Sequence, residues 1–211
     1  ASPAISASPT PTSSRSGRPI AVAITGGIGA GKSAALAAFA RHGAATVSSD
    51  NIVHRLLRED DAIRRALLDR FGERILDEAG QLDRKAIADI VFADREALAW
   101  LEALVHPRVV REYLEWREGL ARLPNPPALS ATEVPLLYEV GGESRFDAVV
   151  VITAPEEIRA ARARSAVDDR SQRLIPDEEK VKRADFAYVN DGTLVELDAF
   201  VSGVVASLTR R

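Results

Sequence analysis

Eight consecutive residues near the start of the chain have the types and spacing of a phosphate-binding loop. Residues 26–33 read Gly-Gly-Ile-Gly-Ala-Gly-Lys-Ser and fit the pattern G-x-x-x-x-G-K-[ST]. Glycines let successive backbone N–H groups point inward around phosphate oxygens, because a Cβ would obstruct the backbone angles that this requires. The Lys32 ammonium would reach the β- and γ-phosphates, and the Ser33 hydroxyl would bind Mg²⁺. The predicted nucleotide-binding residues are Gly27, Ile28, Gly29, Ala30, Gly31, Lys32 and Ser33.

The segments on either side of the loop are those that such a loop needs. Residues 20–24, Ile-Ala-Val-Ala-Ile, predict a strand, and residues 34–39, Ala-Ala-Leu-Ala-Ala-Phe, predict a helix. A bound anion would then lie at a helix N-terminus, where unpaired N–H groups and the helix dipole favour negative charge. The motif and its context therefore agree on nucleotide binding.

The composition narrows the class of protein. The chain has 211 residues, 46% hydrophobic content and a formal net charge of −3, which suits a compact domain with no general attraction for nucleic acid. It has no cysteine and three histidines, so disulfides and thiolate metal sites are excluded and the expected metal is Mg²⁺ carried with the nucleotide. No apolar run approaches the ~20 residues of a membrane span. We expect a cytoplasmic protein without nucleic-acid or membrane partners.

Residues 1–18 differ in composition from the rest. They are rich in Ser, Pro, Thr and Ala, contain no acidic residue and show no periodicity. We expect a disordered N-terminal extension there, because such a segment cannot bury enough apolar surface to fold. Residues 19–211 are predicted to form a single domain.

Strands alternate with helices in that domain. The continuously apolar run 148–153 is typical of a strand buried on both faces of a sheet. Alternation of this kind predicts an α/β fold with a doubly wound parallel sheet. The other predicted strands are 44–48, 128–134 and 186–189, and the predicted helices of this part are 155–166, 177–184 and 193–208.

Residues 61–122 are almost entirely helical in pattern. Asp83 and Asp94 are expected to cap helices, and His106-Pro107 is expected to begin another. A helical insertion between strands indicates a substrate-binding subdomain. The predicted divisions are a core of 19–58 and 124–155, a helical substrate subdomain of about 59–123, a lid of about 156–183, and a C-terminal strand and helix at 184–209.

Further motifs give the chain, from about residue 20 to 208, a resemblance to the dephospho-coenzyme A kinase family. The resemblance implies a P-loop NTPase-type fold with a lid segment. It also implies transfer of the γ-phosphoryl group of ATP, with Mg²⁺, to the ribose 3′-hydroxyl of dephospho-CoA. The motifs are Thr25 to Ser33, Ser48-Ser49-Asp50 with His54-Arg55, Val105-His106-Pro107, Glu133-Val134-Pro135-Leu136-Leu137-Tyr138-Glu139, Ala184-Asp185 and Asn190-Asp191-Gly192.

Asp50 is the candidate catalytic acid–base group. The family commonly carries Asp-x-Asp after its second strand, whereas this chain has Ser48-Ser49-Asp50 and keeps only the second acid. The resemblance implies that Asp50 acts on the acceptor hydroxyl, and a carboxylate there could accept its proton or orient it for in-line attack. The alternative is that Asp50 only caps a helix beginning at Asn51.

An arginine-rich segment is the candidate lid. Guanidinium groups brought over the phosphates would stabilise the negative charge of the transition state. Matching to the family places the lid arginine at Arg162, and the alternative is an ordinary solvated helix face. The arginines of this segment are Arg159, Arg162, Arg164, Arg170 and Arg173.

The remaining candidate residues each have a plainer alternative. Glu133, at the end of a predicted strand, would hold Mg²⁺ through water or else pair with an arginine. The resemblance implies that Asn190 and Gly192 lie by the adenine; the alternative is a simple turn. His106 contacts the acceptor or only packs at a helix start. The residues assigned to the acceptor, besides Asp50, are His54, His106, Pro135 and Leu136.

Two other functions remain open at this point. Another small-molecule or nucleoside monophosphate kinase would share the loop, lid and sheet, and a non-catalytic nucleotide-binding module would share the loop. A guanine-nucleotide switch is disfavoured because the chain has no Asn-Lys-x-Asp motif to read the base. The oligomeric state does not follow from the sequence.

Overall fold

The computed structural model describes residues 17–162 and 175–210. Most of the N-terminal segment expected to be disordered lies outside these residues. Arg18, which is described, donates a hydrogen bond from Nη2 to Oδ1 of Asp147 over 2.9 Å. The chain forms two compact units, one running to Ser48 and resuming at Trp116, and the other covering Ser49–Glu115.

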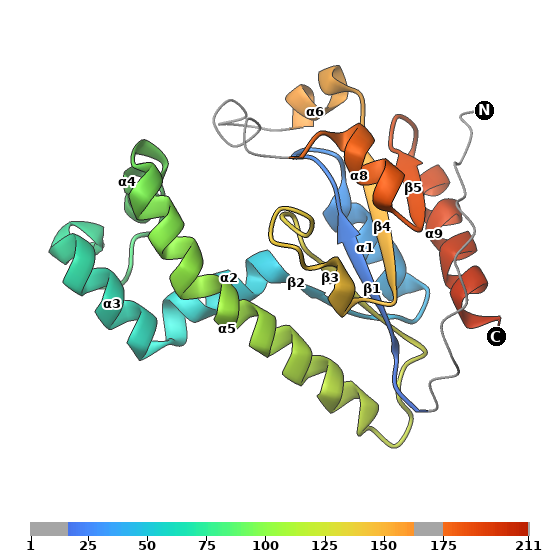
Figure 1. Ribbon diagram of the computed structural model, residues 1–211, viewed down its shortest axis with the longest axis horizontal. Helices are drawn as coiled ribbons and strands as arrows, with labels where there is room; N and C mark the ends of the chain where they lie inside the picture. The colour runs from blue at the N-terminus through green and yellow to red at the C-terminus, as the bar shows by residue number, and fades with distance from the viewer. Residues whose placement is uncertain (1–16, 163–174, 211) are drawn as a thin grey trace. The chain divides into compact units, whose positions relative to one another are not determined.

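A five-stranded parallel sheet forms the centre of the first unit (Figure 1). The strands lie in the order β2-β3-β1-β4-β5, and each neighbouring pair is parallel. This arrangement confirms the predicted α/β fold. The strands are β1 (Ile20–Thr25), β2 (Ala45–Ser48), β3 (Leu129–Glu133), β4 (Ala148–Thr153) and β5 (Phe186–Val189).

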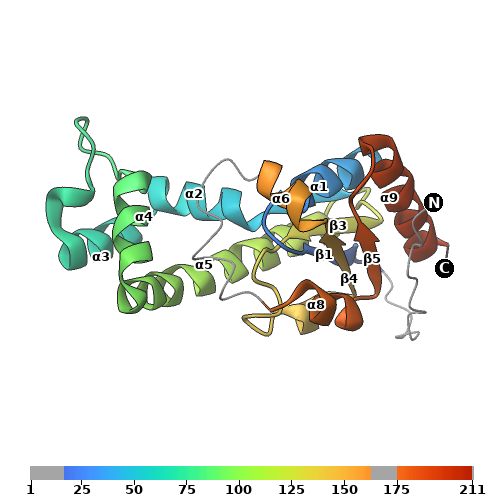
Figure 2. The same cartoon turned by 90° about the horizontal axis from the view of Figure 1, so that it is seen from above.

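Helices cover both faces of the sheet, as Figure 2 shows. Val150 and Ile152 of β4 pack with α1 (Lys32–Arg41) and α9 (Leu194–Thr209). Val149 and Val151 alternate with them and face the other side, where α8 (Asp177–Arg183) packs. A strand between two helical layers must be apolar at successive positions, which explains the continuous apolar run. The remaining short elements of this unit are η2 (Glu143–Arg145) and α6 (Glu156–Arg162).

The parallel strands end at a common edge of the sheet. β1 leads directly into the glycine loop, and Ser48 at the end of β2 is paired in register with Glu133 at the end of β3. Asn190 follows β5 by one residue. Open α/β sheets bind ligands at such an edge, so the fold gathers these polar residues where chemistry is expected.

The second unit is helical throughout its main elements. Three of its helices, α3, α4 and α5, begin at acidic caps. The Asp60 carboxylate accepts hydrogen bonds from Ala62 N and Ile63 N, and Asp83 caps α4 in the same way. The carboxylate of Asp94 accepts from the backbone of the first turn of α5, so the expected caps at Asp83 and Asp94 are confirmed. The elements are α2 (Ser49–Glu59), α3 (Asp61–Phe71), η1 (Gly72–Ile75), α4 (Arg84–Ala93) and the first part of α5 (Arg95–Ala121).

The expected helix start at His106-Pro107 is wrong, because α5 continues through Pro107. Buried residues recur every four positions on each side of it, at Val105, Val109 and Tyr113. This apolar stripe holds one continuous helix despite the proline, which costs one backbone hydrogen bond. Packing therefore outweighs the local preference.

The helical unit begins at Ser49, whereas the sequence places the substrate subdomain at about 59–123. The assignment of core, substrate subdomain and lid stays a prediction, and part of the lid lies outside the described residues. No helix in the described part of the chain is long and apolar enough to cross a membrane.

Candidate active site

The loop between β1 and α1 depends on glycine at particular positions. Gly26 has φ 140° and Gly31 has φ 98°, which are values that side chains oppose. A Cβ at Gly26 would lie 1.9 Å from the carbonyl oxygen of Ile152, and one at Gly31 would lie 2.2 Å from Nδ2 of Asn190. The loop is therefore pressed against the end of β4 and the turn after β5.

Lys32, the first residue of α1, is held on this loop. Its Nζ donates a hydrogen bond to the carbonyl oxygen of Gly27 over 2.9 Å, and the residue is only 9% exposed. A cation kept in a partly dry site interacts strongly with a phosphate that enters, because little water screens it. The structure thus places the predicted phosphate-binding lysine beside the predicted phosphate-binding backbone.

Ser33 and Glu133, the two predicted metal residues, are brought together. The Ser33 hydroxyl lies 3.2 Å from Oε1 and 3.1 Å from Oε2 of Glu133, whose side chain is buried. The hydroxyl donates to the carboxylate and keeps its lone pairs, so both groups offer the oxygen ligands that Mg²⁺ prefers. The described residues contain no group of three or more His, Cys, Asp and Glu for a metal.

Asn190 is buried and fastens the loop rather than standing in a free turn. Its Nδ2 donates to the carbonyl oxygen of Ala30 over 2.8 Å, and its backbone N–H donates to Thr153 O over 2.7 Å. Glycine is required at position 192 for a different, local reason. A Cβ there would lie 2.1 Å from Oε2 of Glu196, which closes the capping box of α9 with Thr193. Contact of either residue with adenine stays a prediction.

Two of the five candidate lid arginines are described, and both lie near the loop. Nη1 of Arg162 is 3.5 Å from the carbonyl oxygen of Asn190, and Nη1 of Arg159 is 3.3 Å from Oδ2 of Asp177. Arg162 thus lies beside the residue that contacts the loop, and its role as the lid arginine stays a prediction. Arg164, Arg170 and Arg173 lie outside the described residues.

The segment after β3 is tied to the rest of the sheet unit. Pro135 accepts a hydrogen bond at its carbonyl from the Thr25 hydroxyl over 3.3 Å. Glu139 accepts from Ile175 N over 3.0 Å and lies 2.8 Å from Nζ of Lys180, which is wholly buried. The ends of the segment are thus fixed, while Pro135 and Leu136 remain partly exposed.

Tyr138 in the same segment does not serve as a base. Burial raises the pKa of its phenol to about 12, although the positive charge of Arg183 opposes this shift. The Arg183 guanidinium lies 4.3 Å from the ring centroid. A phenol with so high a pKa stays protonated at neutral pH and is a poor proton acceptor there.

In the helical unit, Asp50 and His54 lie one turn apart on α2. The helix begins at Ser49, which places Asp50 in the first turn and not at the cap of a helix starting at Asn51. His54 contacts the Arg84 guanidinium through Nε2. Burial and the positive charge of Arg84 lower the pKa of His54, while the negative charge of Asp50 opposes them. His54 therefore favours its neutral form, which can accept a hydrogen bond. The third candidate acceptor residue of this unit, His106, is partly exposed within α5.

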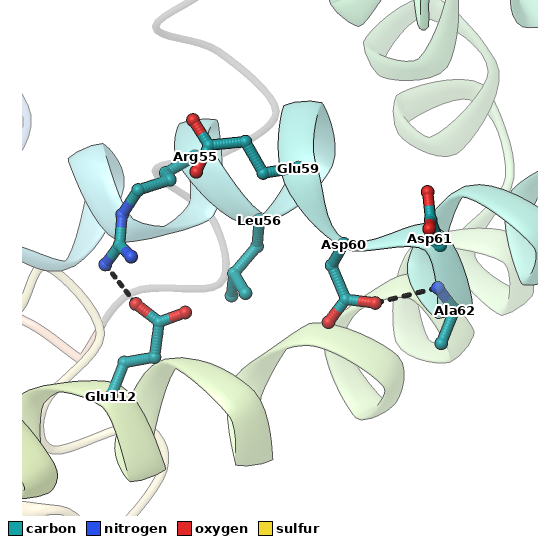
Figure 3. A pocket seen from close by; sticks show the side chains of 7 residues that line it. All are labelled: Arg55, Leu56, Glu59, Asp60, Asp61, Ala62 and Glu112. Atoms are coloured by element: carbon teal, nitrogen blue, oxygen red, sulfur yellow. Dashed lines mark hydrogen bonds and ion pairs between the residues drawn. The ribbon is translucent and has the colours of Figure 1, made fainter.

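A pocket of about 430 Å³ lies among α2, α3 and α5 (Figure 3). Its charged groups are engaged within the unit: Arg55 pairs with Glu112, and Asp60 caps α3 and lies 3.3 Å from Nε of Arg108. The hydrogen bond from Ile63 N is the main cause of the lowered pKa of Asp60. None of the predicted site residues lines this pocket. The lining residues are Arg55, Leu56, Glu59, Asp60, Asp61, Ala62 and Glu112.

Sequence reasoning missed two contacts of the loop. The hydrogen bond from Asn190 to Ala30 joins residues 160 positions apart, and no motif links them. Asp177 lies beside Gly27 because α8 begins there, and only its place after Pro176 signals a helix start. Both contacts depend on tertiary packing.

Comparison with known proteins gives one consistent family. A sequence profile of the dephospho-CoA kinase family matches residues 20–196. The dephospho-CoA kinase of Aquifex aeolicus (strain VF5) is 34% identical over 195 residues, covering 90% of this chain and 97% of that protein. The crystal structure of TT1252 from Thermus thermophilus has a TM-score of 0.73 and 38% identity, covering 91% of this chain and 99% of that one. Dephospho-CoA kinase from Campylobacter jejuni has a TM-score of 0.67 and 26% identity, covering 90% and 97%.

Proposed function

The chain belongs to the dephospho-CoA kinase family, and on that premise we propose how its residues transfer the γ-phosphoryl group of ATP to dephospho-CoA. The match over residues 20–196 confirms the resemblance that the sequence indicates, so the chain is a phosphotransferase. One observation carries the assignment of the donor site. Ser33 and Glu133 contact each other next to Lys32, at the end of the glycine loop.

The donor side works by positioning and by charge. Backbone N–H groups of the loop bind the phosphates of ATP, and Lys32 turns from Gly27 O to the β- and γ-phosphates. The hydrogen bond from Asn190 to Ala30 keeps the loop in shape, and Arg162 adds positive charge near the loop. Ser33 would hold Mg²⁺ directly and Glu133 would hold it through water. A bound Mg²⁺ neutralises charge that develops on the phosphate oxygens.

The acceptor side supplies the proton acceptor. The 3′-oxygen of dephospho-CoA forms a bond to the γ-phosphorus while the bond to the β–γ bridging oxygen breaks, and ADP leaves. Asp50 takes the hydroxyl proton or orients that hydroxyl for in-line attack. His54 in its neutral form, together with His106, Pro135 and Leu136, binds the acceptor. Cytoplasmic residence and the absence of nucleic-acid and membrane partners stay predictions.

The test is acceptor-dependent ADP release. The full chain is incubated with Mg·ATP and, separately, dephospho-CoA, nucleoside monophosphates, shikimate and gluconate, and a sample without acceptor measures background hydrolysis. We expect dephospho-CoA alone to raise ADP release above that background. ADP release with another acceptor and none with dephospho-CoA would refute the assignment.

A second measurement tests the metal residues. Glu133→Gln should raise the Mg²⁺ concentration needed for half-maximal rate, because a neutral amide holds a hydrated cation less strongly than a carboxylate. Glu143→Gln, at a partly buried acid remote in sequence from the loop, is the matched control and should leave that concentration unchanged. The same Mg²⁺ dependence in both variants would remove Glu133 from the metal site.

A further inference from the structure

An ion pair in the sheet unit lies directly on the phosphate loop. Arg159 of α6 and Asp177 of α8 approach to 3.3 Å between Nη1 and Oδ2. Their side chains are 32% and 19% exposed, so the pair is only partly screened by water. Neither residue belongs to the loop motif.

Both charged groups press against Gly27. A Cβ built on that glycine would lie 2.7 Å from Nη1 of Arg159 and 3.2 and 3.3 Å from the two carboxylate oxygens of Asp177. The carbonyl oxygen of the same glycine holds Nζ of Lys32. Two cations and one carboxylate therefore meet at one residue of the loop.

The backbone fixes Arg159 in this place. A Cβ at Gly29 would lie 2.7 Å from the carbonyl oxygen of Arg159, so α6 packs onto the loop itself. The backbone of Arg159 is thus held against the loop, and the guanidinium is placed by its contact with Asp177. Nε of Arg159 is also buried and has no hydrogen-bond partner among the described residues, so this donor is left for another acceptor.

A carboxylate is an unusual neighbour for a loop that binds anions. Loop N–H groups, Lys32 and Arg159 all attract negative charge. In this structure the negative charge beside Arg159 is the carboxylate of Asp177. A phosphate entering beside Gly27 offers the same guanidinium two or three charged oxygens, which is a better match to its planar donors. The carboxylate and the phosphate therefore need the same cation.

We propose that Asp177 competes with the nucleotide's phosphates for Arg159. The ion pair opens when a di- or triphosphate binds, and Arg159 turns to the phosphate oxygens. When the nucleotide leaves, Arg159 pairs with Asp177 again. Asp177 thereby weakens phosphate binding and favours release of ADP. This inference rests on the proposed nucleotide site and adds a residue that sets its affinity.

The experiment measures ADP and adenosine binding to the full chain by calorimetry, without any acceptor. Asp177→Asn should lower the Kd of ADP by about two- to fivefold, as expected for a partly exposed pair, and leave the Kd of adenosine unchanged. The gain should shrink at high salt, because ions screen the charge that is removed. Glu178→Gln is the matched control: it removes an exposed acid from the same turn of α8 and should leave both constants unchanged.

An unchanged or higher Kd of ADP in Asp177→Asn would overturn the proposal, and so would an equal gain in Glu178→Gln. Arg159→Gln gives an independent answer if Asp177→Asn does not fold. It should raise the Kd of ADP and not that of adenosine, and an unchanged ADP constant would also overturn the proposal. Thermal unfolding of each variant identifies loss of fold. Because no acceptor is present, failure of the dephospho-CoA assay would refute the proposed function and leave this result standing.

Discussion

The candidate functional residues at the end of the sheet and those on α2 differ in how firmly the fold holds their side chains. At the sheet, Lys32 and Ser33 are already bonded to the loop and to Glu133. Lys32 and Glu133 are buried, and Ser33 is exposed. On α2, Asp50 and His54 are exposed side chains on a helix surface. Folding thus already pairs the residues of the proposed donor site, whereas we expect the acceptor itself to order the proposed acceptor residues when it binds.

Replacing the buried Lys180 tests how much the stability of the sheet unit depends on fixed polar contacts. We expect it to change the free energy of unfolding more than any other substitution proposed here. Lys180→Met leaves the Glu139 carboxylate without its buried cation, which should cost about 3–5 kcal/mol of unfolding free energy in urea titration. Lys182→Met is the control, since Lys182 is 68% exposed and water screens its pair with Glu179, so the free energy of unfolding should change little. Equal losses would erase the contrast between buried and exposed charge.

Lys32→Ala tests the organised donor site directly. The lost cation acts where the transition state is most negative, so kcat should fall by about 10²–10³ with the fold intact. Lys85→Ala in the helical unit is the control, because Lys85 is exposed and paired with Asp89. Steady-state kinetics with dephospho-CoA measure both. A kcat near that of the unaltered chain in Lys32→Ala would contradict the donor-site assignment.

Asp50→Asn sharpens the acceptor half of the comparison. Loss of a proton acceptor should lower kcat by about a hundredfold while the KM of ATP changes little. Asp61→Asn, at an exposed acid in the first turn of α3, is the matched control and should keep full kcat. Full turnover in Asp50→Asn would exclude it as the base and favour catalysis by charge and position alone.

The titration of His54 is the smallest expected effect. Its pKa in the folded chain should lie below the ordinary 6.5, chiefly through burial and then through Arg84, and Arg84→Gln should raise it. Because the unfolded chain binds the proton more readily, this group favours folding above pH 6.5, and its contribution falls as the pH drops through the folded pKa. Two-dimensional NMR of the imidazole gives the midpoints. A midpoint above 6.5 would contradict the lowered pKa, and an unchanged midpoint in Arg84→Gln would exclude a contribution from Arg84.

The sequence is most informative where backbone geometry dictates residue type. The glycine loop, the apolar strand β4 and the caps at Asp83 and Asp94 were predictable because each has a local physical cause. Glu133 was placed at the end of a predicted strand, and it does end β3, which lies beside β1 in the sheet.

Contacts between segments far apart in the sequence were harder to predict. Pro107 misled the prediction because an apolar stripe spanning α5 outweighs one lost hydrogen bond. The pairing of Arg159 with Asp177 needed the packing of two helices against one loop, which no local pattern encodes. Residue types that a local motif requires are thus easier to find in a sequence than contacts that tertiary packing creates.

The hydrogen bond from Asn190 to Ala30 has a consequence for how the protein matures. Ala30 is made early in synthesis, but its partner arrives 160 residues later, with the last strand of the sheet. A contact between such distant positions pays a large loop-closure entropy and forms late in folding. A nascent chain that has made β1 and α1 therefore carries the glycine motif without its contact to Asn190, which the loop gains only after β5 has been made.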